Sequence, residues 1–292
     1  MLVIIGFITV SLCVFGAFAA HGGNLAVLWQ PSEFIIIGGA AFGSMLIAAP
    51  ISTLKDLVHQ VMAAIKGKKV TKEEYTQVLM LLYEIIKTAK GNPLSLEAHI
   101  EKPENSEIFK KYPAVLANHH ALSFMADTLK VQISAPMSPY DLEDLMDKDM
   151  EAIHHAENRA PAQVAKVGDA MPGLGIVAAV LGVVQTMGKL TMGKEVIGHS
   201  VAAALVGTFL GILISYGYIQ PLAAKMEGQI GESSAMFNTI KAALIAFAKD
   251  CSPKVCVEFA RRSIPPENRP SFEEVDKATS NAGKGGGAAA AA

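Results

Sequence analysis

Long uncharged stretches alternate with charged segments along this chain of 292 residues. Two such stretches, 170–188 and 200–224, are separated only by a short polar turn. A helix rises about 1.5 Å per residue, so a stretch of this length crosses the roughly 30 Å hydrocarbon core of a bilayer. The pattern therefore predicts a transmembrane hairpin. Neither stretch contains Asp, Glu, Lys or Arg, so we expect that no ionisable group of this chain carries an ion across the membrane here.

Two further apolar stretches lie near the N-terminus. Met1–Ala20 is uncharged and long enough to span, and it lacks the basic start of a signal peptide, which favours a membrane helix over a cleaved leader. The other stretch, Phe34–Leu54, is bounded by Glu33 and Lys55. Its Gly39-x-x-x-Gly43 spacing either lets another helix approach closely or is an accident of a stretch rich in small residues. The chain is thus expected to cross the membrane four times.

The basic residues predict how these spans are oriented. Of the 25 Lys and Arg residues, 14 lie in 55–166 and nine follow position 224, whereas the two short turns between spans carry none and two. Basic residues concentrate on the cytoplasmic side of a membrane. We therefore expect both long segments and the N-terminus inside, and the two short turns outside.

The expected fold is an all-α membrane protein with four transmembrane helices and a large cytoplasmic helical domain between spans two and three. No strand pattern competes with the helical one. The expected segments are transmembrane helices 1 and 2 in 1–54, the cytoplasmic helical domain in 55–168, transmembrane helices 3 and 4 in 169–224, a cytoplasmic helical extension in 225–264, and a partly disordered or artificial tail in 265–292.

Capping signals divide the cytoplasmic part into helices. Thr71 and Glu74 form a capping box that opens a helix running to about Lys90. Ser138, followed by a proline, marks another helix start. The remaining predicted helices cover 55–66, 95–101, 104–111, 113–134 and 225–250. We expect Pro265-Pro266 to end the ordered part, Arg269–Glu273 to follow as an extended, charged segment, and the sequence to be of low complexity from Gly283.

Composition and motifs give no support for an enzyme. With 51% hydrophobic and 18% charged residues, the chain is more apolar than a soluble domain, and its net charge of -2 gives no argument for nucleic acid binding. Adjacent histidines at 119–120 and 154–155 point about 100° apart on a helix, which favours surface histidines over metal ligands. The three cysteines are interpreted as free thiols. We therefore expect no metal and no cofactor.

Pro172, Pro221 and Thr208 are the residues of the hairpin with distinctive chemistry. A proline lacks a backbone N–H and clashes with the preceding turn, so each should bend or begin a helix near the inner face. Residue type alone favours ordinary helix punctuation for the prolines. It likewise favours a hydrogen bond from the Thr208 hydroxyl to its own helix backbone.

Several motifs occur along the chain in an order typical of one membrane-protein family. They are the 14 residues of Val167–Val180, the segment Val206–Leu222 with its Val-Gly-Thr-Phe-Leu-Gly start, and the shorter matches Pro31–Ile36, Ser106–Phe109, Tyr112-Pro113 and Arg269–Phe272. With these motifs the chain resembles the MotA family of bacterial flagellar stator proteins. The resemblance covers the chain up to its Ala-rich tail.

The resemblance implies an assembly in the bacterial inner membrane. Family members form a ring, a homopentamer, around two helices of a MotB-type partner that is anchored to peptidoglycan. The partner carries the membrane Asp that is protonated and deprotonated, which supplies the carboxylate that the predicted spans lack. The complex is then expected to be a proton channel that converts proton flow into torque for flagellar rotation, with the proton as its coupling ion.

The resemblance also implies roles for individual residues of the spans. Pro172 and Pro221 fall where family members couple ion passage to motion, and Thr208 falls where a Thr lines the ion route. Ala179 stands where sodium-driven relatives have a Thr, and it offers no oxygen ligand to a hard cation, so proton drive is favoured. Thr186 is a further hydroxyl in the same span, about two turns from Ala179.

In the cytoplasmic domain, the resemblance implies a contact with the rotor ring protein FliG. Lys90 and Glu97 fall at the basic and acidic positions that contact the rotor through opposite charges. The family commonly has Arg at the first position, and this chain is one residue shorter between the two. Lys keeps the charge that steers the partner but not the planar fork of Arg. Solvated surface charges are the alternative interpretation of both residues.

Two other functions compete with this interpretation. One is an energising subunit of an ExbB/TolQ-like envelope complex that drives a periplasmic partner; those relatives usually have three spans, so four spans argue against it. The other is a membrane enzyme or solute transporter, which needs polar residues that converge at the midplane. The spans offer few such residues beyond Thr208, Thr186, Gln185, Ser200 and Ser44.

Overall fold

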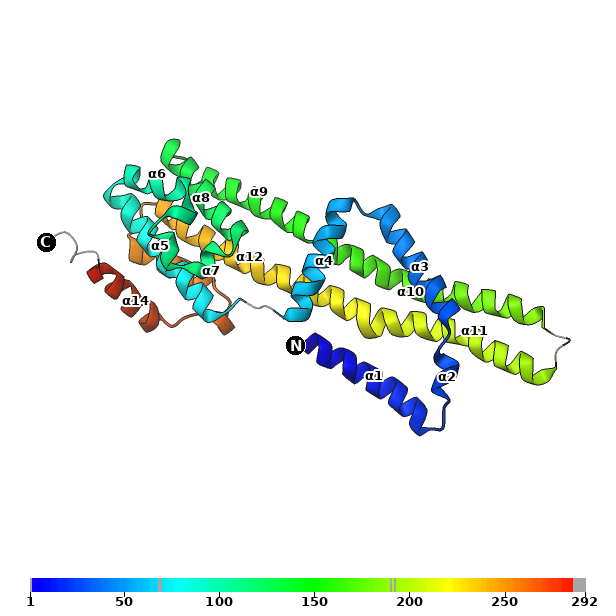
Figure 1. The fold of residues 1–292 in the computed structure, drawn as a ribbon. Helices are drawn as coiled ribbons and strands as arrows, with labels where there is room; N and C mark the ends of the chain where they lie inside the picture. Colours follow the sequence, from blue (N-terminus) through cyan, green and yellow to red (C-terminus); the bar gives the residue numbers. More distant parts are fainter. Residues whose placement is uncertain (1, 68–69, 190, 192, 286–292) are drawn as a thin grey trace. The chain divides into compact units, whose positions relative to one another are not determined.

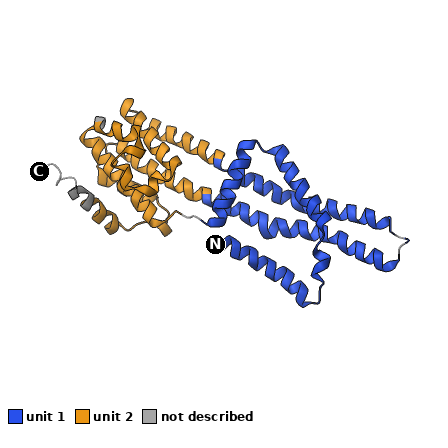
Figure 2. Ribbon diagram, in the orientation of Figure 1, with its two compact units in different colours: residues 1–68, 157–229 blue, residues 69–156, 230–292 orange. Residues whose placement is uncertain are grey.

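The structure of this chain, a computed structural model, describes residues 2–67, 70–189, 191 and 193–285. All regular elements in these residues are helices, which confirms the predicted all-α class (Figure 1). The chain divides into two compact units that Figure 2 colours separately. Unit 1 comprises Met1–Lys68 and Glu157–Gln229, and unit 2 comprises Lys69–Ala156 and Ile230–Ala292.

Unit 1 contains the apolar helices. Its elements are α1 (Leu2–Ala20), α2 (Leu25–Leu28), α3 (Pro31–Ala48), α4 (Ile51–Lys66), α10 (Arg159–Met187), α11 (Lys194–Ile214), the π-helix η4 (Ser215–Ile219) and the first part of α12 (Gln220–Ala248). Within the described residues, four helical stretches are long and apolar enough to cross a membrane. They are Leu2–Ala20, Leu25–Ala48 and the apolar parts of Pro139–Met187 and Lys194–Ala248. The chain is therefore a membrane protein, and the four predicted spans are confirmed.

The second span ends earlier than the sequence pattern predicts. Helix α3 ends at Ala48 and α4 begins at Ile51, so a continuous helix over Phe34–Leu54 is wrong. The cause is Pro50, which lacks an N–H and disfavours the helical conformation of the residue before it. Its own backbone is extended, with φ -66° and ψ 155°.

Two apolar clusters hold unit 1 together. Helix α3 packs on α10 and α11 through Ile37, Ala41, Met171, Ala178, Val206 and Leu210. A second cluster contains Ala64, Ala160, Val164, Leu222, Ala223 and Met226 of α4, α10 and α12. In contrast, α1 contains no buried residue. Its apolar sides are thus left for lipid or for another chain.

Unit 2 is a helical domain built around α5. Its elements are α5 (Lys72–Gly91), α6 (Pro93–Glu101), the 3-10 turns η1 (Pro103–Asn105) and η2 (Phe109–Lys111), α7 (Pro113–Leu116), α8 (His119–Ser134), α9 (Pro139–Glu157), the later part of α12, α13 (Pro253–Ser263), the 3-10 turn η5 (Pro266–Asn268) and α14 (Phe272–Gly285). Half of the 20 residues of α5 are buried. The predicted capping box at its start is confirmed, because Thr71 Oγ1 accepts a hydrogen bond from Glu74 N and Glu74 Oε2 accepts one from Thr71 N.

Two of the predicted helices in unit 2 are interrupted. The helix expected over 113–134 breaks between α7 and α8, because the Asn118 side chain accepts a hydrogen bond from Ala121 N and caps a new helix start. The segment 104–111 forms only the short turns η1 and η2. There the Ser106 hydroxyl accepts hydrogen bonds from Ile108 N and Phe109 N, which favour a turn over a helix.

The prediction that the ordered part ends at Pro265-Pro266 is wrong, because η5 and α14 follow. The predicted extended segment Arg269–Glu273 is non-helical at 269–271, where Arg269 is extended, and helical from Phe272. Ser271 and Glu274 form a second capping box, with Ser271 N 2.7 Å from Glu274 Oε2 and Glu274 N 3.2 Å from Ser271 Oγ. Lys72 also pairs with Glu274 at 2.8 Å, and the pKa of Glu274 falls to about 2 because of the Lys72 ammonium group and the Ser271 backbone N–H. Most of the predicted low-complexity end, 286–292, lies outside the described residues.

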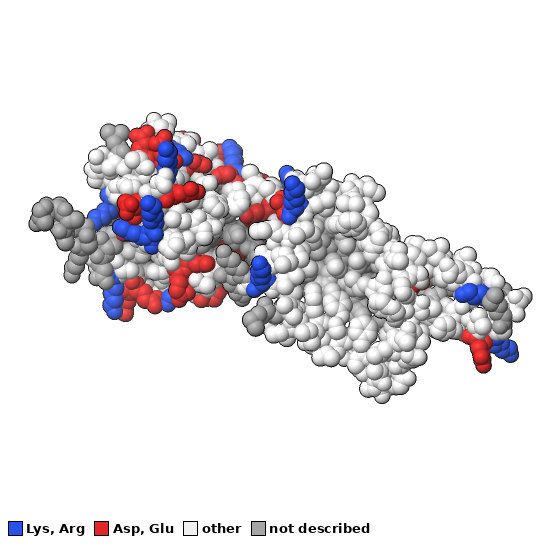
Figure 3. Space-filling model, in the orientation of Figure 1, with Lys and Arg blue, Asp and Glu red and all other residues white. Residues whose placement is uncertain are grey.

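Charge is distributed unequally between the units. On the face shown in Figure 3, charged side chains are sparse over unit 1 and frequent over unit 2. The same contrast appears in the sequence of the spans, which are almost free of charges. Such a surface fits a membrane-embedded unit 1 and a water-exposed unit 2.

Candidate functional site

The hairpin of α10 and α11 is packed closely enough that the two backbones touch. A Cβ atom added at Gly211 would lie 2.6 Å from the carbonyl oxygen of Met171, and one added at Gly175 would lie 2.8 Å from the carbonyl oxygen of Gly207. Real Cβ atoms do not approach backbone atoms this closely. On α10, Gly168 and Gly182 stand seven residues on either side of Gly175 and also face the partner segment closely. Glycine at these positions therefore sets the distance between the helices.

Pro172 lies inside α10, and its missing N–H is compensated from the other arm of the hairpin. In a regular helix the N–H of residue 172 would donate to the carbonyl oxygen of Gly168. Here the buried hydroxyl of Ser215 donates to that oxygen at 2.7 Å. A side chain from η4 thus satisfies the carbonyl that Pro172 leaves without an intrahelical donor.

Pro221 stands two residues past the end of a π-helix. Over Ser215–Ile219 the backbone widens to a π-helix, and Gln220 N donates to Ser215 O, five residues back. A π-helical turn inside a long helix is rare and is often found at functional sites. Next to Pro221, the Gln220 amide donates to Asp169 Oδ1 at 2.6 Å and to Ala165 O at 3.3 Å. These bonds join the irregular segment to α10, close to Pro172 in sequence.

The first span also contacts the π-helix. Ser11 of α1 and Tyr218 of η4 share a hydrogen bond of 2.8 Å between their hydroxyl groups. The Phe7 ring packs edge-on against the Tyr218 ring, with centroids 5.2 Å apart. A change of helical register at η4 would therefore displace Tyr218 and alter its contacts with α1.

Ala179 and Thr208 lie at the same level of the hairpin. A Cβ atom at Gly207 would be 3.2 Å from Ala179 N, and Thr208 is the next residue along α11. Both side chains are half-buried. Among the described residues the Thr208 hydroxyl makes no hydrogen bond, so the predicted bond to its own backbone is not formed. Thr186 is different: it is buried, and its hydroxyl donates to Gly182 O at 2.8 Å.

Glu33 is a residue of this region that the sequence pattern missed. It was expected at the edge of the second span, but Pro31 occupies the first helical position, so Glu33 lies inside α3. Its side chain is buried between α3 and α11, and a Cβ atom at Gly207 would be 2.6 Å from Glu33 Oε2. The expectation that the spans contain no carboxylate is therefore wrong. The motif Pro31–Ile36, with a proline two residues before the acid, was the signal that could have placed it.

Lys90, the predicted rotor contact, makes an ion pair within unit 2. Its Nζ lies 2.6 Å from Asp250 Oδ1 and 2.9 Å from Asp250 O. Asp250 is the one described residue other than glycine with positive φ, 58°, and it is the second residue past the end of α12. The Lys90 ammonium group lowers the pKa of Asp250. Glu97 is exposed on α6, and no hydrogen bond or ion pair joins it to Lys90 among the described residues.

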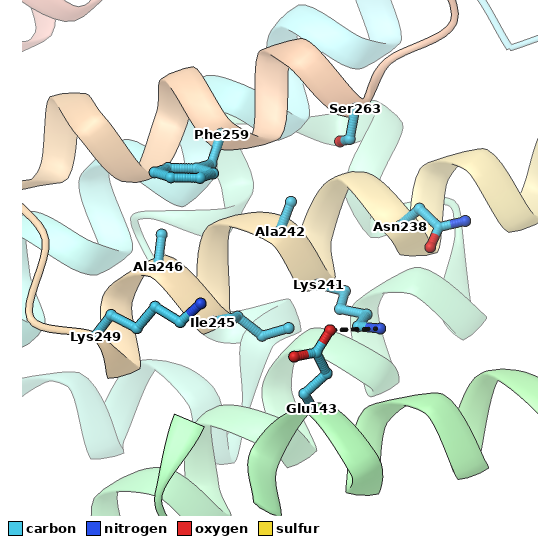
Figure 4. Close-up of a pocket in the computed structure, with 9 residues that line it drawn as sticks. All are labelled: Glu143, Asn238, Lys241, Ala242, Ile245, Ala246, Lys249, Phe259 and Ser263. Atoms are coloured by element: carbon cyan, nitrogen blue, oxygen red, sulfur yellow. Dashed lines mark ion pairs between the residues drawn. The ribbon is translucent and has the colours of Figure 1, made fainter. Parts of the chain in front are cut away.

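A groove of about 440 Å³ lies in unit 2 between α9, α12 and α13 (Figure 4). Its lining residues are Glu143, Asn238, Lys241, Ala242, Ile245, Ala246, Lys249, Phe259 and Ser263. Lys241 is paired with Glu143 at 3.5 Å and with Asp147 at 2.6 Å. The groove combines an apolar floor with ammonium groups, and its lining offers no nucleophile paired with a general base.

The described residues contain no group of three or more His, Cys, Asp or Glu side chains that could hold a metal ion. The paired histidines at 119–120 and 154–155 are exposed, as the sequence pattern predicts. Cys13, Cys251 and Cys256 form no disulfide with one another.

Comparison with known proteins places this arrangement in one family. The family model "Motility protein A N-terminal" matches residues 4–93, and that of the "MotA/TolQ/ExbB proton channel family" matches 117–246. Motility protein A of Escherichia coli (strain K12) is 38% identical over 279 residues, which cover 95% of this chain and 94% of that protein. The chain belongs to the MotA family.

Other similar proteins agree with this assignment. The chemotaxis protein LafT of Vibrio parahaemolyticus is 36% identical over 94% of this chain and 96% of that protein. The structure of C. jejuni MotAB matches with a TM-score of 0.75 and 18% identity, over 92% of this chain and 98% of that one. The flagellar MotAB stator complex of Bacillus subtilis matches with a TM-score of 0.72 and 22% identity, over 91% and 96%. The two structures share the fold of this MotA-family chain.

The structure groups the predicted site residues of this MotA-family chain into three sets. Ala179 and Thr208 both lie close to Gly207, beside Glu33, at the contact between α10 and α11. Pro172 and Pro221 both belong to the region that Ser215 and Gln220 connect. Lys90 and Glu97 lie in unit 2. Thr186 is turned to its own helix backbone and joins none of these sets.

Proposed function

We propose that this chain is a stator subunit of the bacterial flagellar motor, which forms a proton channel with a MotB-type partner and converts proton flow into torque on the rotor. The observation that carries the proposal is the 38% identity to a motility protein A over 95% of the chain. The match to the MotA/TolQ/ExbB proton channel family supports proton conduction. The four apolar spans support a place in the bacterial inner membrane.

Exposed apolar sides of the spans support an assembly of several copies around a partner. No residue of α1 is buried. On α10, the side chains of Ile176, Val180 and Val184 are each more than half exposed. In a ring, proposed to be a homopentamer, such surfaces would meet lipid, neighbouring copies and the partner's helices. The partner's membrane Asp would then pass beside Ala179 and Thr208.

Pro172 and Pro221 allow their helices to bend within the membrane. Neither proline has an N–H, so bending at these residues breaks no hydrogen bond donated by their own backbone nitrogen. Around Pro172 the compensating bond comes from Ser215, and a hydroxyl can follow a small displacement of its acceptor. In the proposed mechanism, proton binding and release by the partner's Asp shift α10 and η4 relative to each other. Repetition around the ring would turn the subunits against the partner.

The proton is proposed as the coupling ion because the described lining offers poor ligands for sodium. A hard cation requires several oxygen ligands, whereas Ala179 supplies only a methyl group. Thr186 is fully buried, about two turns from Ala179, and its hydroxyl donates to Gly182 O. Thr208 is the remaining hydroxyl at this level.

In unit 2, Lys90 and Glu97 are proposed to contact the rotor ring protein FliG. The internal pair with Asp250 neutralises part of the Lys90 charge and fixes the position of its ammonium group. An acidic partner would therefore meet a preformed Lys90–Asp250 pair rather than a mobile lysine.

The proposal is tested by complementation of a strain that lacks its own stator genes. The full chain and its MotB-type partner are expressed together, and swimming speed is measured in sodium-free and in sodium-rich medium. We expect swimming in both media, and none when either chain is omitted. Swimming in sodium-rich medium alone would contradict proton drive, and no swimming in either medium would contradict the stator function.

A further inference from the structure

Glu33 occupies a position where the helix pattern calls for an apolar residue. The buried stripe of α3 consists of Glu33, Ile37 and Ala41, which are spaced four residues apart and face α10 and α11. The exposed fraction of Glu33 is 6%. The first residue of the buried stripe, where α3 contacts α10 and α11, therefore carries a carboxyl group.

One oxygen of this carboxyl group has no partner. Among the described residues, Glu33 Oε2 is the one buried side-chain oxygen or nitrogen without a hydrogen bond. Its position is defined by α11, because a Cβ atom at Gly207 would lie 2.6 Å from Oε2 and 3.0 Å from Ala178 Cβ. The absence of a side chain at Gly207 thus leaves the space into which the carboxyl group points.

The site lies within the depth of the hairpin rather than at its rim. Gly207 is 13 positions past Lys194, where α11 begins, so the site is about 20 Å along that helix. Thr208 is the next residue, and Ala179 N is 3.2 Å from the same Cβ position at Gly207. Glu33 is consequently a neighbour of the two residues that were predicted to lie along the ion route.

A charged carboxylate without a partner is strongly disfavoured in such a place. Burial of an unpaired charge in an apolar membrane setting costs several kcal/mol, and ionisable residues inside membrane helices usually serve ion or proton transfer. The neutral, protonated carboxyl group avoids that cost. The burial of Glu33 and the lack of a partner for Oε2 therefore favour the protonated form.

The other titratable groups of the neighbouring helices do not neutralise Glu33. Helix α2, which also packs on α11, has none. On α10 and α11 they are Arg159, Lys166, Asp169, Lys194, Glu195 and His199. Lys166 and Asp169 stand nine or more residues before Ala178, which lies beside Glu33, and Asp169 is hydrogen-bonded to Gln220. Among the described residues none of the six makes an ion pair or a hydrogen bond with Glu33 Oε2.

We propose that Glu33 is a proton-binding site of this chain, which gains and loses a proton during each transport step, in addition to the carboxyl group of the MotB-type partner. The inference rests on the proposed function. The proton arrives from water on the outer side, converts the carboxylate to the carboxyl group, and leaves to the partner's carboxylate when the helices move. The site favours a proton over a metal cation, because the atoms beside Oε2 at Gly207 are the Ala178 methyl carbon and the Ala179 backbone nitrogen, neither of which is an oxygen ligand.

The test uses the full chain with its partner in lipid vesicles, and compares E33Q and E33D with the parent. Glu33→Gln keeps the size and polarity of the protonated carboxyl group but exchanges no proton, and Glu33→Asp keeps the proton site with a shorter arm. We expect E33Q to assemble with the partner and to conduct protons about 100-fold more slowly, as for the loss of a positioned proton-transfer group, and E33D to retain part of the flux. Glu195→Gln, at an exposed acid of α11, is the matched control and should conduct as the parent does.

A second measurement reads the proton itself. Infrared difference spectra between acidic and alkaline vesicles should contain a carboxyl C=O band that is lost in E33Q and retained in Glu195→Gln. Parent-like proton flux in E33Q, or the same carboxyl bands in E33Q and parent, would overturn the inference. If the parent complex conducts no protons, the proposed function fails, while the infrared band still decides whether Glu33 binds a proton.

Discussion

The Ser215 hydroxyl donates a hydrogen bond of 2.7 Å to the carbonyl oxygen of Gly168. Gly168 stands four residues before Pro172, so this is the carbonyl that the proline deprives of its intrahelical donor. Ser215 in turn begins the π-helix that ends just before Pro221. A single side chain thereby links the two prolines that were predicted to couple ion passage to motion.

This link predicts the effect of Ser215→Ala. The substitution leaves a buried carbonyl oxygen unsatisfied, which should lower the free energy of unfolding by about 1–3 kcal/mol and reduce swimming speed. In a Pro172→Ala background the new N–H can donate to Gly168 O, so S215A should cost less stability there. Thermal unfolding of the parent, both single variants and the double variant measures this coupling. Additive effects of the two substitutions would contradict the link.

The backbone contact of α10 with α11 predicts the effect of Gly211→Ala. The new methyl group would meet Met171 O at 2.6 Å, so the helices must separate, with an expected loss of about 1–3 kcal/mol. Gly228→Ala is the control, because a Cβ atom there meets nothing within 4 Å in this chain. Thermal unfolding in detergent compares the two. Equal melting temperatures for both variants would show that the close contact is not required.

Variants of the Lys90–Asp250 pair can distinguish a structural role of Lys90 within unit 2 from a contact of Lys90 with the rotor. Charge reversal in K90E should destabilise unit 2 and abolish swimming. The double variant K90E/D250K should restore the ion pair and part of the melting temperature, while the bond to the backbone oxygen of residue 250 stays lost. If Lys90 also contacts the rotor, the double variant should still swim poorly. Lys87→Glu, at an exposed residue of the same helix, is the control for reversed charge. Full swimming by K90E/D250K would assign Lys90 a structural role alone.

Glu258 gives unit 2 a defined dependence on pH. The Arg261 guanidinium group, with help from Arg262, lowers the pKa of Glu258 from 4.5 to about 2. A carboxylate with a lowered pKa stabilises the fold above its ordinary pKa, and that contribution is lost as the pH falls from about 4.5 towards 2. Hydrogen exchange in α13 should therefore be faster in E258Q than in the parent at pH 7. The two proteins should become alike near pH 2, whereas Glu104→Gln should behave as the parent throughout. An E258Q protein with parent-like exchange at pH 7 would argue against this interpretation.

The spans could be predicted because each is a long, continuous apolar stretch that can be recognised from the sequence alone. Twenty apolar residues without charge have few alternatives to a membrane helix, and the capping box at Thr71 was recognised from two residues. The same signal at Ser271 was present but was overlooked behind a Pro-rich segment. Similarly, the Asn118 cap that divides α7 from α8 is a local signal that the continuous apolar pattern concealed.

The site was harder to predict because its contacts join distant parts of the chain. Pro172 and Pro221 were chosen by type, but the bond from Ser215 to Gly168 spans 47 residues and has no local signature. Glu33 stood one residue outside the apolar stretch and was taken for its boundary. Only the packing of α3 against Gly207 shows that this acid is buried. For Lys90, the partner Asp250 is 160 residues away in sequence.

The most direct test of the account is proton flux through the purified complex in sodium-free lipid vesicles under an imposed membrane potential. We predict that vesicles with this chain and its MotB-type partner acidify on the side to which protons are driven, that neither chain alone does so, and that Pro172→Ala abolishes the flux. A complex that conducts sodium but no protons, or a Pro172→Ala complex that conducts as the parent does, would contradict the account.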